Sequence, residues 1–237
     1  MLVDIFSSFD DHNQVFMSMY FFTWGFTFFV ILVFTLTYWL YMPRWSMMIS
    51  IFKTTISSQV FRSFSVSLGG FMNVISGLFL FLIFMNLLGL IPYVFSPTSH
   101  LAISLSIGLP MWMSLILSAV IYNFSSVIAS LLPMGAPAML NPFLVLIESV
   151  SISVRPITLS VRLMANMSAG HIVLSLIGNY LTGALLSVSF SATMFLIMVQ
   201  VFYTIFEFGI SLIQAYIFCL LITLYSDEHP HSWMKIF

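Results

Sequence analysis

Charged side chains are scarce in this chain: Asp, Glu, Lys and Arg make up 5% of its 237 residues, whereas 61% are hydrophobic. Because soluble domains contain about 25% charged residues, this composition excludes a soluble globular protein and indicates an integral membrane protein. The formal net charge of −1 excludes the basic surface that nucleic-acid binding needs. Asp4, Asp10 and Asp11 stand where a cleavable secretory signal would be basic, so we expect no such signal.

The sequence is also poor in the motifs of enzymes. Its single cysteine, Cys219, excludes an intrachain disulfide and lies in an apolar run, which is typical of a packing residue. A phosphate-binding glycine loop, a metal-ligand cluster and a nucleophile triad are all missing from the sequence. The two spaced histidines His229 and His231 are weak evidence for a metal site. We therefore expect no catalytic site, no cofactor and no bound metal in this chain.

Long uncharged runs predict helices that cross a bilayer. A crossing helix needs about 20 apolar residues, and three runs reach that length, namely residues 15–41, 69–94 and 101–124. Acidic residues precede the first run, and Arg44, Lys53 and Arg62 follow it. Because Lys and Arg favour the inner side of a membrane, we expect the N-terminus to face outward.

The segment after the first run has the pattern of an amphipathic helix. Within residues 46–68, apolar side chains recur at helical spacing opposite Thr and Ser, namely Ile49, Phe52, Ile56, Val60 and Phe64. This pattern favours a helix that lies on the inner membrane surface. A solvated loop is the alternative.

Two further apolar segments, residues 141–180 and 191–225, are much longer than an upright crossing requires. We therefore expect a long, strongly tilted antiparallel helix hairpin with its turn near Val188. Residues 125–140 contain two prolines and a glycine and predict a loop. The expected fold is an all-α integral membrane protein with a single membrane domain over residues 1–237.

Arg162 is the residue of the hairpin whose insertion into a bilayer costs the most free energy. Arginine stays cationic in a protein, and a charge near the bilayer centre costs about 2.5–3.5 kcal/mol on insertion scales. Glu148 and Arg155 precede it at intervals of seven and Asn166 follows it by four, so these side chains share one helical face. His171 points to the other side, about 13 Å further along the axis. Charges within membrane segments typically mark an ion or proton path.

The final helix carries a second polar stripe, namely Gln200, Glu207 and Gln214, with Tyr203 beside it. Folding the hairpin about its turn places Arg162 opposite Gln214 and His171 near Glu207. Glu148 then falls at the open end, where the last acidic residues of the chain lie. The order along the hairpin is therefore a His/Glu pair, a fixed cation and a group of carboxylates, which is the layout of a proton entrance, a barrier and a proton exit.

Several of these side chains also have a structural interpretation. Glu148 and Arg155 could form an ion pair at the membrane interface, and His171 could be a hydrogen-bonded interior histidine. The two glutamines could bond across helices, as amides in membranes do. Glu207 has no basic neighbour on its own helix, and the cost of Arg162 needs a reason. For these two residues a functional role is favoured.

Short motifs follow one another along the chain in a specific order: Asn86–Tyr93 (NLLGLIPY), Leu132–Pro137 (LPMGAP), Pro142–Glu148 (PFLVLIE), Arg155–Pro156, Arg162–Asn166 (RLMAN) and Ala169–His171 (AGH). This ordered set resembles subunit a of F-type ATP synthases, most of all the mitochondrial form. The likeness covers nearly the whole chain and is most specific between Leu132 and His171.

The resemblance implies a proton-translocating stator subunit without a catalytic site of its own. Such a subunit lies in lipid in the mitochondrial inner membrane, beside a rotor ring of small proton-binding subunits and a peripheral stalk. Arg162 matches the essential arginine of the family and Gln214 the glutamine near it. Glu207 and His171 match the pair that lines the half-channel from the intermembrane space, and Glu148 matches the half-channel on the matrix side.

The remaining candidates on the proton path are Asn166, Arg155 and Tyr203. Phe208 departs from relatives that carry a second acid after the glutamate, which leaves proton uptake to Glu207 and His171. The runner-up function is a secondary transporter or a proton-pump subunit of a respiratory complex, which predicts inverted repeats or a central pocket that the sequence lacks. A purely structural anchor is the third possibility.

Overall fold

The computed structural model describes residues 9, 25, 29, 32, 44–63, 66, 68–91, 96–132, 140–186 and 190–229. These residues form helices and their connections, and none of them lies in a strand. The predicted first span, residues 15–41, falls outside the described residues except for Gly25, Phe29 and Leu32, whose backbone is helical. That span therefore stays a prediction.

The described elements follow one another as α2 (Arg44–Val60), α3 (Phe71–Gly89), the 3-10 turn η4 (Pro97–Ser99), α4 (Leu101–Tyr122), α5 (Phe124–Ser130), α6 (Asn141–Leu186) and α7 (Phe190–Asp227). Four of them, α3, α4, α6 and α7, are long and apolar enough to cross a membrane. The expected fold class, an all-α integral membrane protein, is confirmed.

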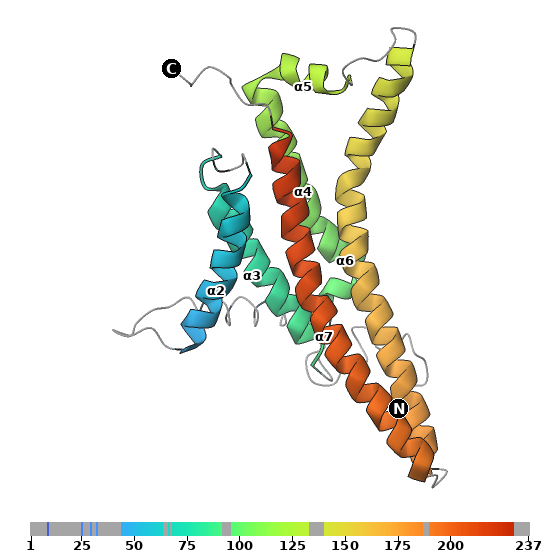
Figure 1. Cartoon of the computed structure of the whole chain (residues 1–237). Helices are drawn as coiled ribbons and strands as arrows, with labels where there is room; N and C mark the ends of the chain where they lie inside the picture. The colour runs from blue at the N-terminus through green and yellow to red at the C-terminus, as the bar shows by residue number, and fades with distance from the viewer. Residues whose placement is uncertain are drawn as a thin grey trace.

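The buried core lies where α3 packs against α7, with α2 on the outer side (Figure 1). Ile75 and Leu82 on α3 and Phe218 on α7 are nearly inaccessible and belong to one apolar cluster. Between helices that lie in lipid, such packing stabilises the fold through van der Waals contacts. The core thereby fixes α7 against α3, and Leu159 and Leu163 of α6 belong to the same cluster.

Helix α2 buries the apolar stripe that the sequence pattern contains. Ile56 and Val60 are buried in the same cluster as α3 and α7, while Lys53 on the other side is exposed. The Gln59 amide donates a hydrogen bond to the Tyr216 hydroxyl on α7. This stripe therefore faces other helices of the chain, and the position of α2 relative to the membrane surface stays a prediction.

The sequence predicts a loop over residues 125–140. This prediction is wrong for the first part of that range, because α5 occupies Phe124–Ser130. Asn123 caps this helix: its side-chain oxygen accepts hydrogen bonds from the Ser126 N–H and the Ser125 hydroxyl. A capping Asn offsets the unpaired N–H groups of a first turn. The prolines that suggested a loop come later, at and beyond Pro133, outside the described residues.

The hairpin of α6 and α7 is the largest unit of the structure. Helix α6 has 46 residues and α7 has 38. At 1.5 Å per residue α6 is about 69 Å long, which exceeds the ~30 Å apolar thickness of a bilayer and requires tilt or extension beyond it. The two helices lie side by side toward the turn and diverge toward the open end, where α4 and α5 lie (Figure 1).

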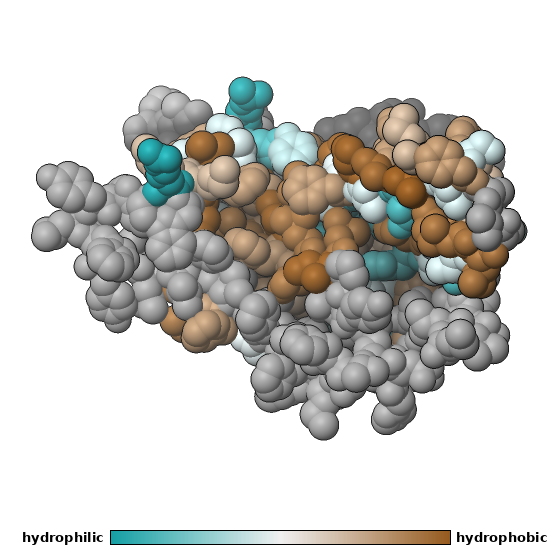
Figure 2. Space-filling view, turned by 90° about the horizontal axis from the view of Figure 1, so that it is seen from below, coloured by the Kyte–Doolittle hydropathy of each residue, from teal (hydrophilic) through white to brown (hydrophobic). Residues whose placement is uncertain are grey.

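Much of the described surface is apolar. In Figure 2, brown, hydrophobic residues make up much of the coloured surface, with teal, hydrophilic residues scattered among them. On α7 near the turn, exposed large side chains include Phe195, Met198 and Phe202. Exposed apolar surface of this extent is expected of a protein whose solvent is lipid and which packs against other membrane chains.

Candidate functional site

Toward the turn of the hairpin, a buried acid of α7 lies directly against the backbone of α6. The Glu207 side chain is 3% exposed, and both of its carboxyl oxygens are buried without a hydrogen-bond partner among the described residues. The nearest part of α6 is Gly170, the residue before His171. The sequence prediction that His171 and Glu207 lie at the same level of the hairpin therefore agrees with the geometry.

Gly170 is what allows this close approach. A Cβ atom at position 170 would collide with the Glu207 carboxyl group, so glycine leaves room for the acid in this position and a larger residue would force the carboxyl group to shift. Gly170 is itself buried in the interface of the two helices. Sequence reasoning quoted this glycine as part of a motif but assigned it no role, because a glycine inside a helix has no pattern that reveals what it contacts.

His171 lies beside this contact and is partly buried. Its Nε2 atom is inaccessible and has no hydrogen-bond partner among the described residues. The ring of Phe9 packs edge-on against the imidazole, with 6.4 Å between ring centroids. We define Gly170, His171 and Glu207 as the turn-side group. It contains two titratable side chains, those of His171 and Glu207, and neither forms an ion pair among the described residues.

The middle of the hairpin is bridged by amides. The Asn166 Nδ2 atom donates to Gln214 Oε1 over 2.7 Å, and Gln214 is buried. One turn along α7, the Ser211 carbonyl accepts from Asn86 Nδ2 on α3 over 3.3 Å. Gln214 therefore bonds to Asn166 and not directly to Arg162. Arg162 lies one turn before Asn166 on α6.

Arg162 itself lies on the outer side of α6. The residue is exposed, as are Val161 and Ala165 beside it, whereas Leu163 is buried toward the core. Among the described residues no carboxylate lies within ion-pair distance of Arg162, and the two ion pairs found there both belong to Arg155. The guanidinium therefore stays available to a group that approaches this face from outside the chain.

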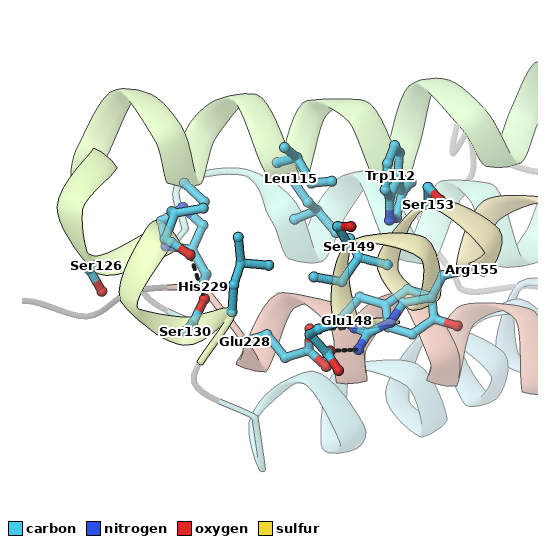
Figure 3. A pocket seen from close by; sticks show the side chains of 16 residues that line it. Trp112, Leu115, Ser126, Ser130, Glu148, Ser149, Ser153, Arg155, Glu228 and His229 are labelled. Carbon is cyan, nitrogen blue, oxygen red and sulfur yellow. Dashed lines mark hydrogen bonds and ion pairs between the residues drawn. The ribbon is translucent and has the colours of Figure 1, made fainter. Parts of the chain in front are cut away.

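At the open end of the hairpin, three charged side chains meet. The Arg155 guanidinium donates through Nη1 to Glu228 Oε2, just past the end of α7, and its Nη2 lies 3.8 Å from Glu148 Oε1. The guanidinium also lies over the Tyr225 ring, 5.2 Å from the centroid, in a cation–π contact. We call Glu148, Arg155 and Glu228 the open-end group; Figure 3 shows them converging.

This group borders a cavity of about 610 Å³ between α4, α5, α6 and the end of α7. Polar side chains on its wall are those of Ser126, Ser130, Ser149, Ser153 and His229, besides the open-end group (Figure 3). His229 Nε2 lies 3.2 Å from the Ser118 hydroxyl on α4. The carboxylates of the open end thus border a cavity with both polar and apolar walls, unlike Glu207.

Two other sequence candidates on α7 have fewer contacts. Tyr203 is partly buried, four residues before Glu207, and its ring packs on Phe206 with centroids 6.1 Å apart. The Oε1 atom of Gln200 is buried without a hydrogen-bond partner among the described residues. Sequence reasoning missed Glu228 as a direct partner of Arg155. The described residues also contain no cluster of His, Cys, Asp and Glu that could hold a metal.

Comparison with known proteins decides the family. The profile of the ATP synthase A chain family matches residues 15–227. The chain belongs to this family. A protein named ATP synthase subunit a from Locusta migratoria is 39% identical over 234 residues, which covers 96% of this chain and 99% of the relative. The protein of that name from Drosophila melanogaster is 38% identical over 233 residues, and the one from Albinaria caerulea is 48% identical over 149.

Membership agrees with the resemblance drawn from the motifs. This member of the ATP synthase A chain family is a multi-pass membrane protein, and its relatives are named as a subunit of the synthase. The match covers the long hairpin, the turn-side group, and Glu148 and Arg155 of the open-end group, whereas Glu228 lies just past its last residue.

Proposed function

We propose that this chain is the proton-translocating stator subunit of a mitochondrial F-type ATP synthase, with two offset proton half-channels separated by Arg162. The observation that carries the proposal is the order of groups along the hairpin. The turn-side group, the exposed Arg162 and the open-end group follow one another along α6, with Asn166 and Gln214 bridging the helices near the cation.

The separation of the groups fits two half-channels. Nine residues part Arg162 from His171 and fourteen part it from Glu148. At 1.5 Å per residue these intervals are about 13 Å and about 21 Å along α6. Neither group can exchange a proton directly with the other across the arginine. A proton must therefore be carried past Arg162 by something outside this chain.

A rotor carboxylate is the carrier that suits this face. A protonated carboxyl group can face lipid, whereas an ionised one is very costly there. Beside the guanidinium of Arg162 the ionised form is favoured by the opposite charge. A carboxylate that arrives at Arg162 therefore gives up its proton on one side and takes a new one on the other before it returns to lipid.

The two groups then serve uptake and release. His171 and Glu207 would deliver protons from the intermembrane space, and Glu148 would pass them toward the matrix. A fixed cation between them repels protons and opposes a direct leak. Each proton that crosses carries about 2.3 kcal/mol per 100 mV of membrane potential. Ring rotation is thereby tied to proton flow, and ATP is made by other subunits of the complex.

The partners follow from the same proposal. The chain would lie in the mitochondrial inner membrane with its N-terminus toward the intermembrane space, next to the ring and the peripheral stalk. Native-gel electrophoresis of mild-detergent membranes, with mass spectrometry of the band that holds this chain, tests this assembly. Co-migration with small ring subunits and an active ATP hydrolase is expected. Migration with redox subunits would favour the proton-pump alternative.

The role of Arg162 has its own test. Arg162→Gln should abolish ATP-driven proton pumping into inverted inner-membrane vesicles, while ATP hydrolysis by the detached catalytic head continues. Arg62→Gln, which removes an exposed arginine after α2, is the matched control and should pump normally. Normal pumping by Arg162→Gln would remove the arginine from the mechanism.

A further inference from the structure

In the open-end group, Arg155 interacts with two acids and lies closer to Glu228 than to Glu148. Arg155 donates a hydrogen bond to Glu228, whereas its distance of 3.8 Å to Glu148 is an ion-pair distance beyond hydrogen-bond range. Tyr225 covers the guanidinium on a further side. Glu228 and Tyr225 both come from the C-terminal end of α7, so that end of the helix anchors Arg155.

The two acids also differ in their place on the chain. Glu148 is on α6, seven residues before Arg155, and its side chain is 40% exposed at the cavity wall. Glu228 follows the last residue of α7 and is 57% exposed. The other titratable groups on this wall are Tyr225 and His229, and α5 contributes only serines and apolar side chains.

We infer that Glu228 is a positioning residue: it holds Arg155 by a direct hydrogen bond and so keeps Glu148 only loosely paired and able to carry protons. A carboxylate gripped by a guanidinium favours its ionised form and accepts a proton less readily. Arginine grips most firmly when both of its terminal nitrogens bind one carboxylate. Glu228 prevents that arrangement at Glu148 by occupying Nη1.

This inference rests on the proposed role of Glu148 in proton release, and it makes an unusual prediction. Removing the acid of Glu228 should slow proton transport through Glu148, although Glu148 is untouched. Without Glu228 the guanidinium is free to bind Glu148 with both nitrogens. Removing the arginine as well should then relieve the defect, because nothing remains to grip Glu148.

The experiment is a double-mutant cycle on the intact ATP synthase in inverted inner-membrane vesicles. ATP-driven proton pumping is measured per assembled complex, with the amount of complex taken from native gels. We expect Glu228→Gln to lower the rate several-fold and Glu228→Asp, which keeps the carboxylate, to restore most of it. The double variant Glu228→Gln/Arg155→Gln should pump clearly faster than Glu228→Gln alone. A double variant as slow as, or slower than, the single one would overturn the inference.

A second variant covers the case in which Glu228→Gln does not assemble. Arg155→Lys keeps the charge but replaces the two-pronged guanidinium with a single ammonium group. It cannot bind Glu148 with two nitrogens, so a rate close to that of the unchanged protein is expected, and a several-fold slower rate would overturn the inference. Glu148→Gln separates the two proposals. If that variant pumps normally, the release role of Glu148 fails; if it is slow and the double variant shows no relief, only the positioning role fails.

Discussion

The two ends of the α6–α7 hairpin hold their acids in opposite ways. Glu207 at the turn side is buried against Gly170 and forms no hydrogen bond with the described residues. Glu148 at the open end is partly exposed, borders the open-end cavity and has Arg155 nearby. The hairpin therefore buries one acid away from any ion pair among the described residues and leaves the other partly exposed beside a cation.

The difference follows from helix packing. Near the turn α6 and α7 lie in close contact, and glycine at position 170 lets the acid of one helix touch the backbone of the other. Toward the open end the helices diverge, and α4 and α5 leave a hollow between them (Figure 1). A close helix pair excludes water from its polar groups, whereas diverging helices expose them. The same hairpin can thus build two unlike environments from similar residues.

Among the variants that test the comparison of the two ends, the largest effect is expected from removing the acid at the turn side. Glu207→Gln keeps the size of the side chain but cannot release a proton, so ATP-driven pumping should fall about tenfold or more, equivalent to about 1.4 kcal/mol in the rate barrier. Proton pumping in inverted vesicles measures it. An unchanged rate for Glu207→Gln would exclude Glu207 from the path.

A smaller loss is expected when the close contact is blocked. Gly170→Ala places a methyl group where the Glu207 carboxyl lies, so the acid must move and pumping should fall several-fold. Gly178→Ala is the matched control on the same helix, because a Cβ there meets nothing within 4 Å. Equal rates for the two alanine variants would show that the contact has no part in proton uptake.

The bridge between the two ends should matter less. Asn166→Ala removes the hydrogen bond to Gln214, and such bonds between membrane helices contribute about 0.6 kcal/mol on average. Pumping should fall about two- to threefold as Gln214 loses its fixed orientation. Asn179→Ala, an exposed asparagine of α6, serves as the control. A tenfold loss in Asn166→Ala would mean that Asn166 acts in proton transfer itself.

The smallest effect is expected at the wall of the open-end cavity. Asn123→Ala removes the cap of α5, which typically costs about 1 kcal/mol. Amide hydrogen exchange over Phe124–Ser130 should become about fivefold faster, with little change in pumping. Ser130→Ala, at the other end of α5, should leave this exchange nearly unchanged. Unchanged exchange in Asn123→Ala would show that the cap does not stabilise the helix.

Sequence reasoning reached the helices of the hairpin and the order of its polar groups, because both depend on length and periodicity. Uncharged runs locate α3 and α4 directly, and folding the two long segments about their turn brings His171 and Glu207 to one level. It also placed Glu148 at the end of the hairpin where Glu228 lies. These features follow from residue spacing alone.

Other features depend on three-dimensional packing and have no such signal. Helix α5 was missed because serines and the prolines that follow it resemble a loop, and only the cap at Asn123 shows its start. The contact of Gly170 with Glu207 depends on how closely two helices approach. The bond of Arg155 to Glu228 depends on the divergence of α6 from α7. Spacing within one helix predicts its faces but not these distances.

The most direct test of the central claim is whether the two ends of the hairpin open to opposite sides of the membrane. Ser149 lies on the wall of the open-end cavity, and Ser175 lies one turn beyond His171 on the same face of α6. The test uses the two variants Ser149→Cys and Ser175→Cys. The native Cys219 is buried and provides the background. A membrane-impermeant thiol reagent should label position 149 only from the matrix side and position 175 only from the intermembrane-space side. Labelling of both positions from the same side would contradict two half-channels separated by Arg162.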